Sequence, residues 1–392
     1  MADKITYNLI SADSHILEPA DLFEKRLPAK LRGRAPKLKP YDGGSAWFVG
    51  DLDPVPLPPT MRTGSGYRLS LMPDVSAVSY EDVLPALLDP GERLKAQAAD
   101  SVDAEILYPT PVLWDAIKLL DDDELKLACV KAYNDWISGF CAFAPDRLIG
   151  LGKIPTTSVA DAVTEVRRCA GDLKLRGFVL DAFPSGAKTA GSPEDEPFWE
   201  AVNEIGLPVS MHIGVGPTAN TSPETGPAPG MRPQMAQIVL PLVASGVFDR
   251  YPNVRIVLAH ADAGWSMHWL EYTDMYFLRH RHLNHYTLQN QDALPSEYIR
   301  SRVWFTFHHD RTAVWNRHNI GPAHLIWASH FPYEDSNWPD NRQQSARVTA
   351  EAPADVRANL VAGNVARLYR LPGYEQGFDE VALKEFVPLV HY

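Results

Sequence analysis

The sequence predicts an α/β protein that folds as a (β/α)8 TIM barrel with a small hairpin-containing insertion between strands 1 and 2. Three observations support this prediction. The chain has 392 residues, enough for one large barrel with insertions. Eight short hydrophobic runs alternate with helical patterns, which favours parallel strands joined by crossover helices. Several runs end in a polar residue, and a parallel barrel places its active site at the carboxyl ends of its strands.

The predicted strands are short and continuously apolar rather than alternating, as expected for strands that are buried on both faces. Each is rich in Val, Ile, Leu or aromatic residues. The eight predicted strands are residues 7–13, 104–109, 148–154, 176–181, 207–213, 254–260, 302–307 and 324–329.

Helical patterns separate these strands. Residues 122–144 carry apolar side chains at helical spacing and end before Pro145, which cannot continue a helix. Residues 158–171 begin with a Ser158 cap and end at Gly171. Further helices are predicted over residues 198–206, 234–252 and 354–371.

Two stretches interrupt the alternation of strands and helices. Residues 20–98 separate the first two predicted strands by far more than an ordinary connection. Within them, AWFVG and PVPLP flank a Gly-Asp turn, which predicts a small hairpin beside the barrel. Residues 214–233 are rich in Gly, Pro, Ser and Thr, and both a flexible lid and a plain surface loop fit them. We predict one domain over residues 1–392, with a C-terminal tail over 372–392.

The composition argues against some classes of partner. The formal net charge is −12, whereas nucleic acids and anionic membranes are bound by clustered Lys and Arg. The chain does not open with a basic segment followed by a long apolar stretch, so we expect no signal peptide and no membrane-spanning segment. The odd, sparse count of 3 cysteines indicates a reducing compartment, and we expect a cytoplasmic protein.

Side chains that bind metal ions follow four of the predicted strands. Asp13 and His15 end the first strand, His212 the fifth, His260 the sixth and His330 the eighth. Residues two apart on a strand point the same way, so Asp13 and His15 can reach one point. Each position alone has an ordinary explanation, such as a local turn or a buried histidine with a satisfied ring. Together at one barrel mouth they predict a site for Zn, Mn, Fe or a similar divalent ion.

Seven motifs occur in a fixed order over nearly the whole chain. In this order they resemble the amidohydrolase-related family that includes aminocarboxymuconate-semialdehyde decarboxylase and related aromatic-acid decarboxylases. The motifs are SADSHILEP (11–19), APDRLIGLGKIP (144–155), RGFVLDAFP (176–184), VSMHIG (209–214), YPNVRIVLAHADAGW (251–265), WASHFPYEDSNWP (327–339) and AGNVARLY (362–369).

The resemblance implies a (β/α)8 barrel with one divalent metal ion, with Zn favoured and Mn or Fe as alternatives. It implies that Asp13, His15 and His212 are ligands, and that His260 lies near the metal and the substrate. Relatives carry an Asp on the eighth strand that binds the metal and handles a proton. Here that segment reads Ser-His-Phe-Pro-Tyr, with His330 in place of the Asp. A neutral His330 still offers a ligand nitrogen, and a metal-free histidine site is the alternative.

The resemblance favours a metal-dependent decarboxylase, a lyase that acts on a small aromatic or unsaturated carboxylic acid. His260 and His330 are the predicted catalytic residues. A metal-dependent hydrolase or hydratase that acts on an amide, lactone or C–C bond at the same site is the alternative. A barrel without catalytic activity is the third hypothesis.

Four further residues are predicted to contact the small carboxylate substrate. Phe183, Trp265 and Tyr333 lie near strand ends and could line an apolar pocket. Arg232 lies in the predicted lid and could hold a carboxylate by a bidentate pair. The resemblance also implies a homodimer or homotetramer.

Overall fold

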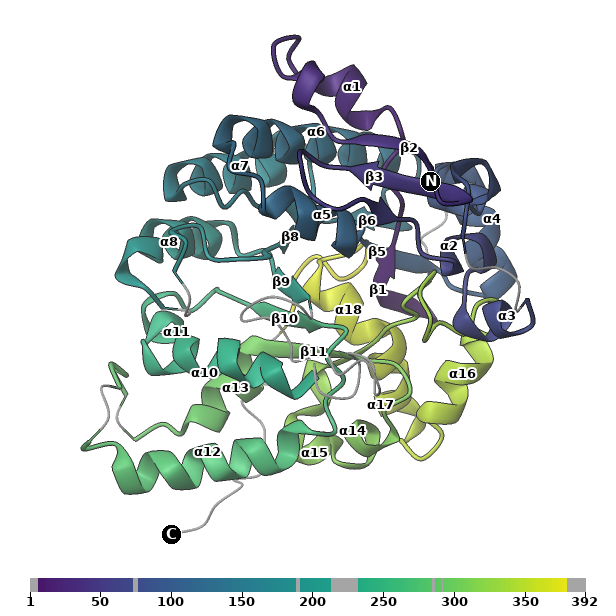
Figure 1. Ribbon diagram of the computed structural model, residues 1–392. Helices are drawn as coiled ribbons and strands as arrows, with labels where there is room; N and C mark the ends of the chain where they lie inside the picture. The colour runs from purple at the N-terminus through teal and green to yellow at the C-terminus, as the bar shows by residue number, and fades with distance from the viewer. Residues whose placement is uncertain are drawn as a thin grey trace.

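The computed structural model describes residues 6–72, 77–187, 191–212, 232–283, 286–290 and 292–378. Nine parallel segments among these residues form the eight strands of a barrel, because β6 and β7 are two parts of one strand interrupted at Leu151 (Figure 1). The segments are β1 (Ile10–His15), β5 (Ala104–Tyr108), β6 (Leu148–Gly150), β7 (Gly152–Lys153), β8 (Phe178–Val179), β9 (Val209–His212), β10 (Ile256–Ala259), β11 (Val303–Phe307) and β12 (Leu325–Trp327).

The barrel closes between its first and last strands. Just after β12, the His330 N–H donates to Asp13 O at 3.0 Å. One residue further on, the His15 N–H donates to Phe331 O at 2.7 Å. The closing hydrogen bonds therefore involve the backbone of three predicted site residues.

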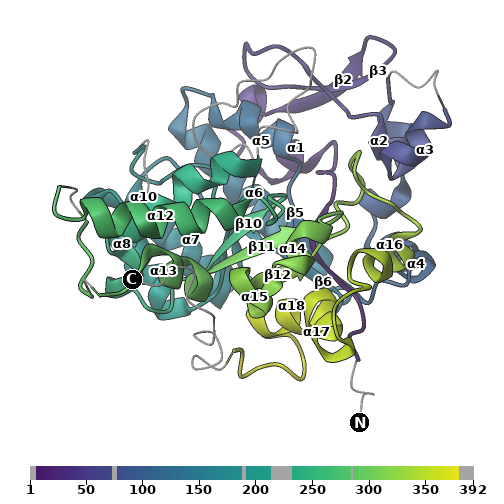
Figure 2. The same cartoon turned by 90° about the horizontal axis from the view of Figure 1, so that it is seen from below.

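Helices surround the strands, as Figure 2 shows from below. Side-chain caps begin several of them: the Asp122 side chain accepts from Leu125 N, and the Ser158 side chain accepts from Asp161 N. The longer helices are α4 (Pro90–Asp100), α5 (Pro111–Lys118), α6 (Asp123–Cys141), α7 (Val159–Gly171), α8 (Glu196–Ile205), α12 (Ser266–His280), α13 (Pro295–Arg302) and α16 (Asn341–Val348).

Two predicted helices differ from the observed ones. The helix predicted over 234–252 is two helices, α10 (Ala236–Ala244) and α11 (Val247–Arg250). Gly246 separates them with a φ of 71°, a left-handed conformation that ends a helix. The helix predicted over 354–371 contains a wide π-helical turn between α17 (Ala354–Ala358) and α18 (Asn364–Leu368).

The long stretch between β1 and β5 contains a three-stranded antiparallel sheet. Its strands are β2 (Lys37–Tyr41), β3 (Gly44–Phe48) and β4 (Val55–Pro56), and it lies to one side of the barrel (Figure 2). After this sheet the chain reaches the loop that follows β12: the Gly66 N–H donates to Glu334 O at 3.0 Å. The stretch therefore contacts the eighth strand's loop across a large sequence separation.

Apolar side chains fill the barrel interior. Ala12, Ile106 and Val257 belong to one buried cluster, which also includes Val365 and Tyr369 from the last helical segment and its end. This packing leaves no channel through the barrel and places polar groups at the carboxyl ends of the strands. Among the described residues, no helix combines the length and the apolar character needed to cross a membrane.

Candidate metal centre and adjoining cavity

A β-bulge in β1 turns Asp13 and His15 toward the barrel mouth. Between Ser11 and Ser14 the pairing advances by one more residue in β1 than in the neighbouring β5. The extra residue reverses which face the later side chains occupy. Ala12 packs in the barrel interior, and in a regular strand Ser14 would follow it on that face. Because of the bulge, the side chains of Asp13 and His15 lie on this face instead of the side chain of Ser14.

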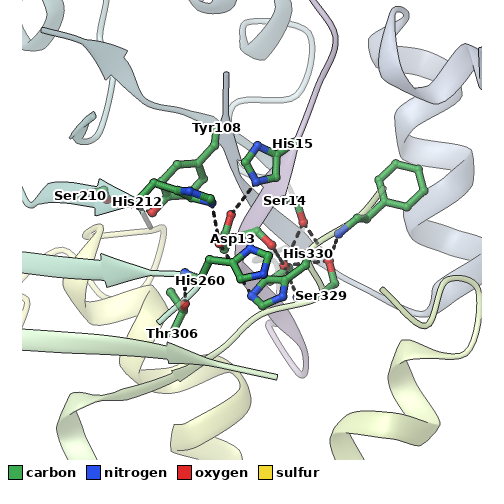
Figure 3. A network of polar contacts seen from close by, with 12 residues as sticks. Asp13, Ser14, His15, Tyr108, Ser210, His212, His260, Thr306, Ser329 and His330 are labelled. Carbon is green, nitrogen blue, oxygen red and sulfur yellow. Dashed lines mark hydrogen bonds and ion pairs between the residues drawn. The ribbon is translucent and has the colours of Figure 1, made fainter. Parts of the chain in front are cut away.

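Asp13 lies among three histidines from the ends of β1, β9 and β12 (Figure 3). His15 Nε2 is 3.2 Å from Asp13 Oδ1, and the Nε2 atoms of His212 and His330 are 3.7 and 3.8 Å from Asp13 Oδ2. Asp13, His15 and His330 are fully buried, and the His212 side chain is 13% exposed. The structure thus brings the four predicted ligand residues together.

The donor atoms of this cluster suit a divalent ion. His15 Nδ1 lies 2.9 Å from Pro109 O. Because a carbonyl oxygen only accepts, Nδ1 carries the proton and Nε2 keeps its lone pair. Both Asp13 carboxylate oxygens and the Nε2 atoms of His15 and His330 form no hydrogen bond to any described residue. A buried carboxylate without partners is costly, and one carboxylate with three imidazoles is a donor set that holds Zn or Mn.

The charge state of Asp13 also favours a cation. Burial alone would raise the pKa of Asp13, but contact with His15 and the nearby His212 and His330 lowers it below its usual range. Asp13 is therefore ionised at neutral pH, the form that binds a metal ion.

Asp335 contacts the other side of His330, and the sequence analysis did not select it. Its Oδ2 lies 3.1 Å from His330 Nδ1 and 2.9 Å from His260 Nε2. The two imidazole rings stack with their centroids 3.9 Å apart and an interplanar angle of 13°. A carboxylate only accepts hydrogen bonds, so both contacting nitrogens donate. A neutral His330 therefore directs an unprotonated Nε2 toward Asp13.

The backbone is strained at both histidines. His260 has a φ of 58° and His330 a φ of 53°, values that cost a non-glycine residue about 1–3 kcal/mol. Hydrogen bonds hold these conformations: the His260 N–H donates to Thr306 Oγ1 at 2.8 Å, and the His330 N–H donates to Asp13 O. Strain of this kind concentrates at functional sites, which supports a role for both residues.

Three serines join β1 to the segment after β12, and Figure 3 labels two of them, Ser14 and Ser329. Ser14 Oγ donates to Ser11 Oγ at 2.9 Å and Ser11 Oγ donates to Ser329 Oγ at 3.0 Å. The Ser329 N–H donates to Ser11 Oγ at 2.9 Å. These buried contacts fix the distance between β1 and the segment after β12, and hence between Asp13 and His330.

Arg93 of α4 holds the backbone of His15 from outside the barrel. Its Nη1 donates to His15 O at 2.8 Å, and its Nε and Nη2 bond the two Glu105 carboxylate oxygens at 2.6 and 3.0 Å. Arg93 is 1% exposed and Glu105 4%. Breaking a buried pair of this kind leaves an uncompensated charge.

We expect Arg93→Met to lower the free energy of unfolding by about 3–5 kcal/mol, because Glu105 loses its partner and His15 O its donor. Urea denaturation followed by circular dichroism measures the change. Lys95→Met is the matched control on the same helix, since Lys95 forms only an exposed pair with Glu92, and we expect it to leave the stability unchanged. Equal stability of the two variants would contradict this role of Arg93.

A small, partly open cavity lies beside the cluster. His15 and His212 line it, together with a charged pair, Lys153 and Asp181. Asp115 and Lys118 also line it. The rest of the lining is aromatic or apolar and consists of Tyr108, Pro109, Pro111, Trp114 and Val179.

The three predicted aromatic substrate contacts do not line this cavity, and their role stays a prediction. Tyr333 packs edge-on against His15 with ring centroids 4.7 Å apart, Phe183 is buried in the core, and Trp265 Nε1 donates to Ala261 O at 2.9 Å. Arg232 begins a short 3-10 helix, but its side chain and residues 213–231, most of the predicted lid, lie outside the described part of the chain.

Two residues at the cavity, Lys153 and Asp181, were not predicted, although their positions in the sequence could have identified them. Lys153 ends β7, and Asp181 follows β8 by two residues. Both are charged residues at the carboxyl ends of buried strands, the same pattern that selected the histidines. Asp335 had no such signal, because it lies in a loop and reaches the site only through the fold.

The amidohydrolase family model matches residues 77–371, most of the chain. Among curated proteins, the gamma-resorcylate decarboxylase of Rhizobium sp. (strain MTP-10005) is 23% identical over 343 residues, which cover 81% of this chain and 96% of that protein. The 2-amino-3-carboxymuconate-6-semialdehyde decarboxylase of Dictyostelium discoideum is 29% identical over 175 residues, which cover 44% of this chain and 47% of that protein.

Solved structures share the fold. An amidohydrolase from Mycobacterium avium subsp. paratuberculosis K-10 has a TM-score of 0.71 at 18% identity and covers 93% of this chain and 98% of its own. The 5-carboxyvanillate decarboxylase of Novosphingobium aromaticivorans DSM 12444, complexed with manganese and 4-hydroxy-3-methoxy-5-nitrobenzoic acid, has a TM-score of 0.67 at 18% identity and covers 93% of this chain and 96% of its own. With a closed barrel and a family match over residues 77–371, this chain belongs to the amidohydrolase family.

Proposed function

We propose that this protein is a metal-dependent decarboxylase of a small aromatic carboxylic acid. One observation carries the proposal: Asp13, His15, His212 and His330 converge in a buried position at the barrel mouth, where His15 and His212 line a cavity with several aromatic and apolar residues. The names of the matched relatives support the same reaction class, since they are decarboxylases of aromatic or unsaturated acids.

In this proposal one divalent ion is held by Asp13, His15, His212 and His330. Zinc follows from the nitrogen-rich donor set, while the manganese in the carboxyvanillate decarboxylase supports Mn as the alternative. The ion supplies a positive charge that orients the substrate carboxylate and stabilises negative charge on the substrate.

Release of CO2 leaves an electron pair on the ring carbon, which takes up one proton to give the arene. We assign this proton transfer to His260, with His330 beside it. The His260 ring centroid lies 5.4 Å from that of His212. His260 Nδ1, the ring nitrogen that does not contact Asp335, would deliver the proton, and the ring would take up a replacement proton from solvent. Asp335 orients His260 through Nε2. Trp114 and Tyr108, in the cavity wall, exclude water from the ring face of the substrate.

Asp335 explains how a histidine can serve at the eighth strand. A single carboxylate at position 330 would bring both a ligand atom and a negative charge. In this chain the two properties are divided: His330 provides the ligand nitrogen, and Asp335 provides the charge 3.1 Å behind it. Carboxylate–histidine–metal arrangements of this kind fix the ring and make the nitrogen a stronger ligand.

The test combines metal analysis with product analysis. After chelator treatment and reloading with Zn or Mn, we expect about one equivalent of bound ion. We also expect metal-dependent CO2 release from a member of a hydroxybenzoate panel, with the arene identified by chromatography. An ion-loaded protein that releases no CO2 from any panel member but hydrolyses an amide or lactone would overturn the decarboxylase assignment. The homodimer or homotetramer and the cytoplasmic location stay predictions.

A further inference from the structure

Lys153 and Asp181 form an ion pair at the barrel mouth, on neighbouring strands. Lys153 ends β7, and Asp181 follows β8. The two strands pair in parallel, with Lys153 opposite Val179. The Lys153 ammonium donates to Asp181 Oδ2. The Lys153 side chain is only 5% exposed and that of Asp181 20%. The pair is therefore largely removed from solvent, yet both residues line the cavity beside His15 and His212.

The surroundings fix the Lys153 ammonium in position. It lies 4.7 Å from the centroid of the Trp114 ring, a cation–π distance. Trp114 is itself held by Glu18, which accepts from Trp114 Nε1 at 2.7 Å. Asn134 anchors the Lys153 backbone, since its Oδ1 accepts from Lys153 N at 2.7 Å and its Nδ2 donates to Lys153 O at 2.9 Å. The strand end is thus secured without the ammonium group.

Because the backbone is anchored without the Lys153–Asp181 ion pair, the burial of this pair needs another explanation. Burying two charges is seldom stabilising compared with apolar residues of similar size. Burial also lowers the pKa of Lys153, to about 7, which adds to the cost of keeping it charged. Buried titratable groups that line a cavity are candidates for functional groups.

We propose that Lys153 and Asp181 form a recognition site for a hydroxyl substituent of the substrate, on the part of the ring that faces away from the metal centre. This inference rests on the proposed function. The ammonium donates a hydrogen bond to the hydroxyl oxygen, and the hydroxyl hydrogen is donated to the Asp181 carboxylate. A hydroxyl group fits because it accepts one hydrogen bond and donates another.

The same pair disfavours other substituents. A second, ionised carboxylate on the ring could accept from Lys153 but has no hydrogen to donate to Asp181, whose charge it would face. A hydrogen or methyl group would leave both buried charges without the hydrogen bonds that water had given them. The site therefore selects aromatic acids by the position of a hydroxyl group as well as by their carboxylate.

Binding of matched ligands to the metal-loaded protein tests the inference without requiring turnover. Isothermal titration would compare benzoate with 2-, 3- and 4-hydroxybenzoate. We expect at least one hydroxy isomer to bind the wild-type protein roughly 10- to 100-fold more tightly than benzoate. In Lys153→Met and Asp181→Asn this preference should disappear while benzoate affinity and metal content are retained. Lys30→Met, which removes a surface lysine paired with Glu124, should keep the full preference.

The possible results separate this inference from the proposed function. Benzoate binding as tightly as all three hydroxy isomers, or an unchanged preference in Lys153→Met, would overturn the inference. The wild-type series decides the first point even if a variant fails to fold. A hydroxyl preference without CO2 release would support the recognition site and contradict the decarboxylase assignment. CO2 release without a hydroxyl preference would support the decarboxylase assignment and contradict the recognition site.

Discussion

Replacing Asp335 by Ala is expected to weaken binding of the divalent ion about 10- to 100-fold, the usual loss when a carboxylate behind a ligating histidine is removed. Without Asp335 Oδ2, which lies 3.1 Å from His330 Nδ1, the ring is free to change tautomer and place its proton on Nε2. Competition against a calibrated chelator measures the affinity. Glu334→Ala changes the exposed neighbouring residue in the same loop and should retain wild-type affinity.

A double-mutant cycle shows whether Asp335 acts through His330. His330→Asp places a carboxylate directly at the eighth strand, so the role of Asp335 behind the ring is lost. In that background, Asp335→Ala should change metal affinity by less than about 3-fold, a coupling that independent sites do not show. Equal losses in both backgrounds would mean that Asp335 acts through the loop and not through the imidazole. No loss in either background would remove Asp335 from the metal site altogether.

Asp13→Asn is expected to have the largest effect of any single change. Asp13 is the only carboxylate among the four proposed ligands, and both of its oxygens lack a hydrogen-bond partner among the described residues. We expect metal affinity to fall by more than the 10- to 100-fold typical of outer partners, and decarboxylation to fall with it. The same substitution removes a buried charge that the nearby histidines stabilise in the metal-free protein, as the lowered pKa of Asp13 indicates.

Melting measurements on both forms of the protein make this prediction distinctive. The metal-free Asp13→Asn protein should melt at a lower temperature than the wild type at neutral pH, because the lowered pKa of Asp13 means that its charge stabilises the folded state. The wild type should gain about 2.7 kcal/mol when the ion is present at 100 times its Kd, and the variant should gain nothing at that concentration. Differential scanning calorimetry with and without metal measures both. A variant that gains as much stability from the ion as the wild type does would contradict the assignment of Asp13 as a ligand.

The barrel and the histidines of its mouth could be predicted because one rule generates them. A parallel strand that is buried on both faces has an uninterrupted apolar sequence, and its last residue lies at the mouth of the barrel. His212 and His330 were found by this rule. Applied without a preference for histidine, it would also have found Lys153 and Asp181.

Other features depend on geometry that no local pattern encodes. The order of residues in β1 indicates that Asp13 and His15 share a face, but not which face, and the bulge between Ser11 and Ser14 settles this through pairing with β5. Asp335 lies five positions beyond His330 in the sequence, and only the path of the loop returns it to the ring. The break at Gly246 likewise requires a backbone angle that the apolar pattern does not reveal.

The contact between Gly66 and Glu334 limits how far the scaffold could be reduced. A β-carbon at position 66 would lie 2.3 Å from Glu334 O. Any residue larger than glycine there would therefore displace Glu334 and the adjacent Asp335. Trp338, at the other end of that loop, donates from Nε1 to Ala96 O at 3.3 Å. A minimal eight-stranded core trimmed of residues 20–88, which retains Arg93, would therefore keep its histidines but lose part of the support for Asp335 behind them, so ion affinity should fall before the barrel unfolds.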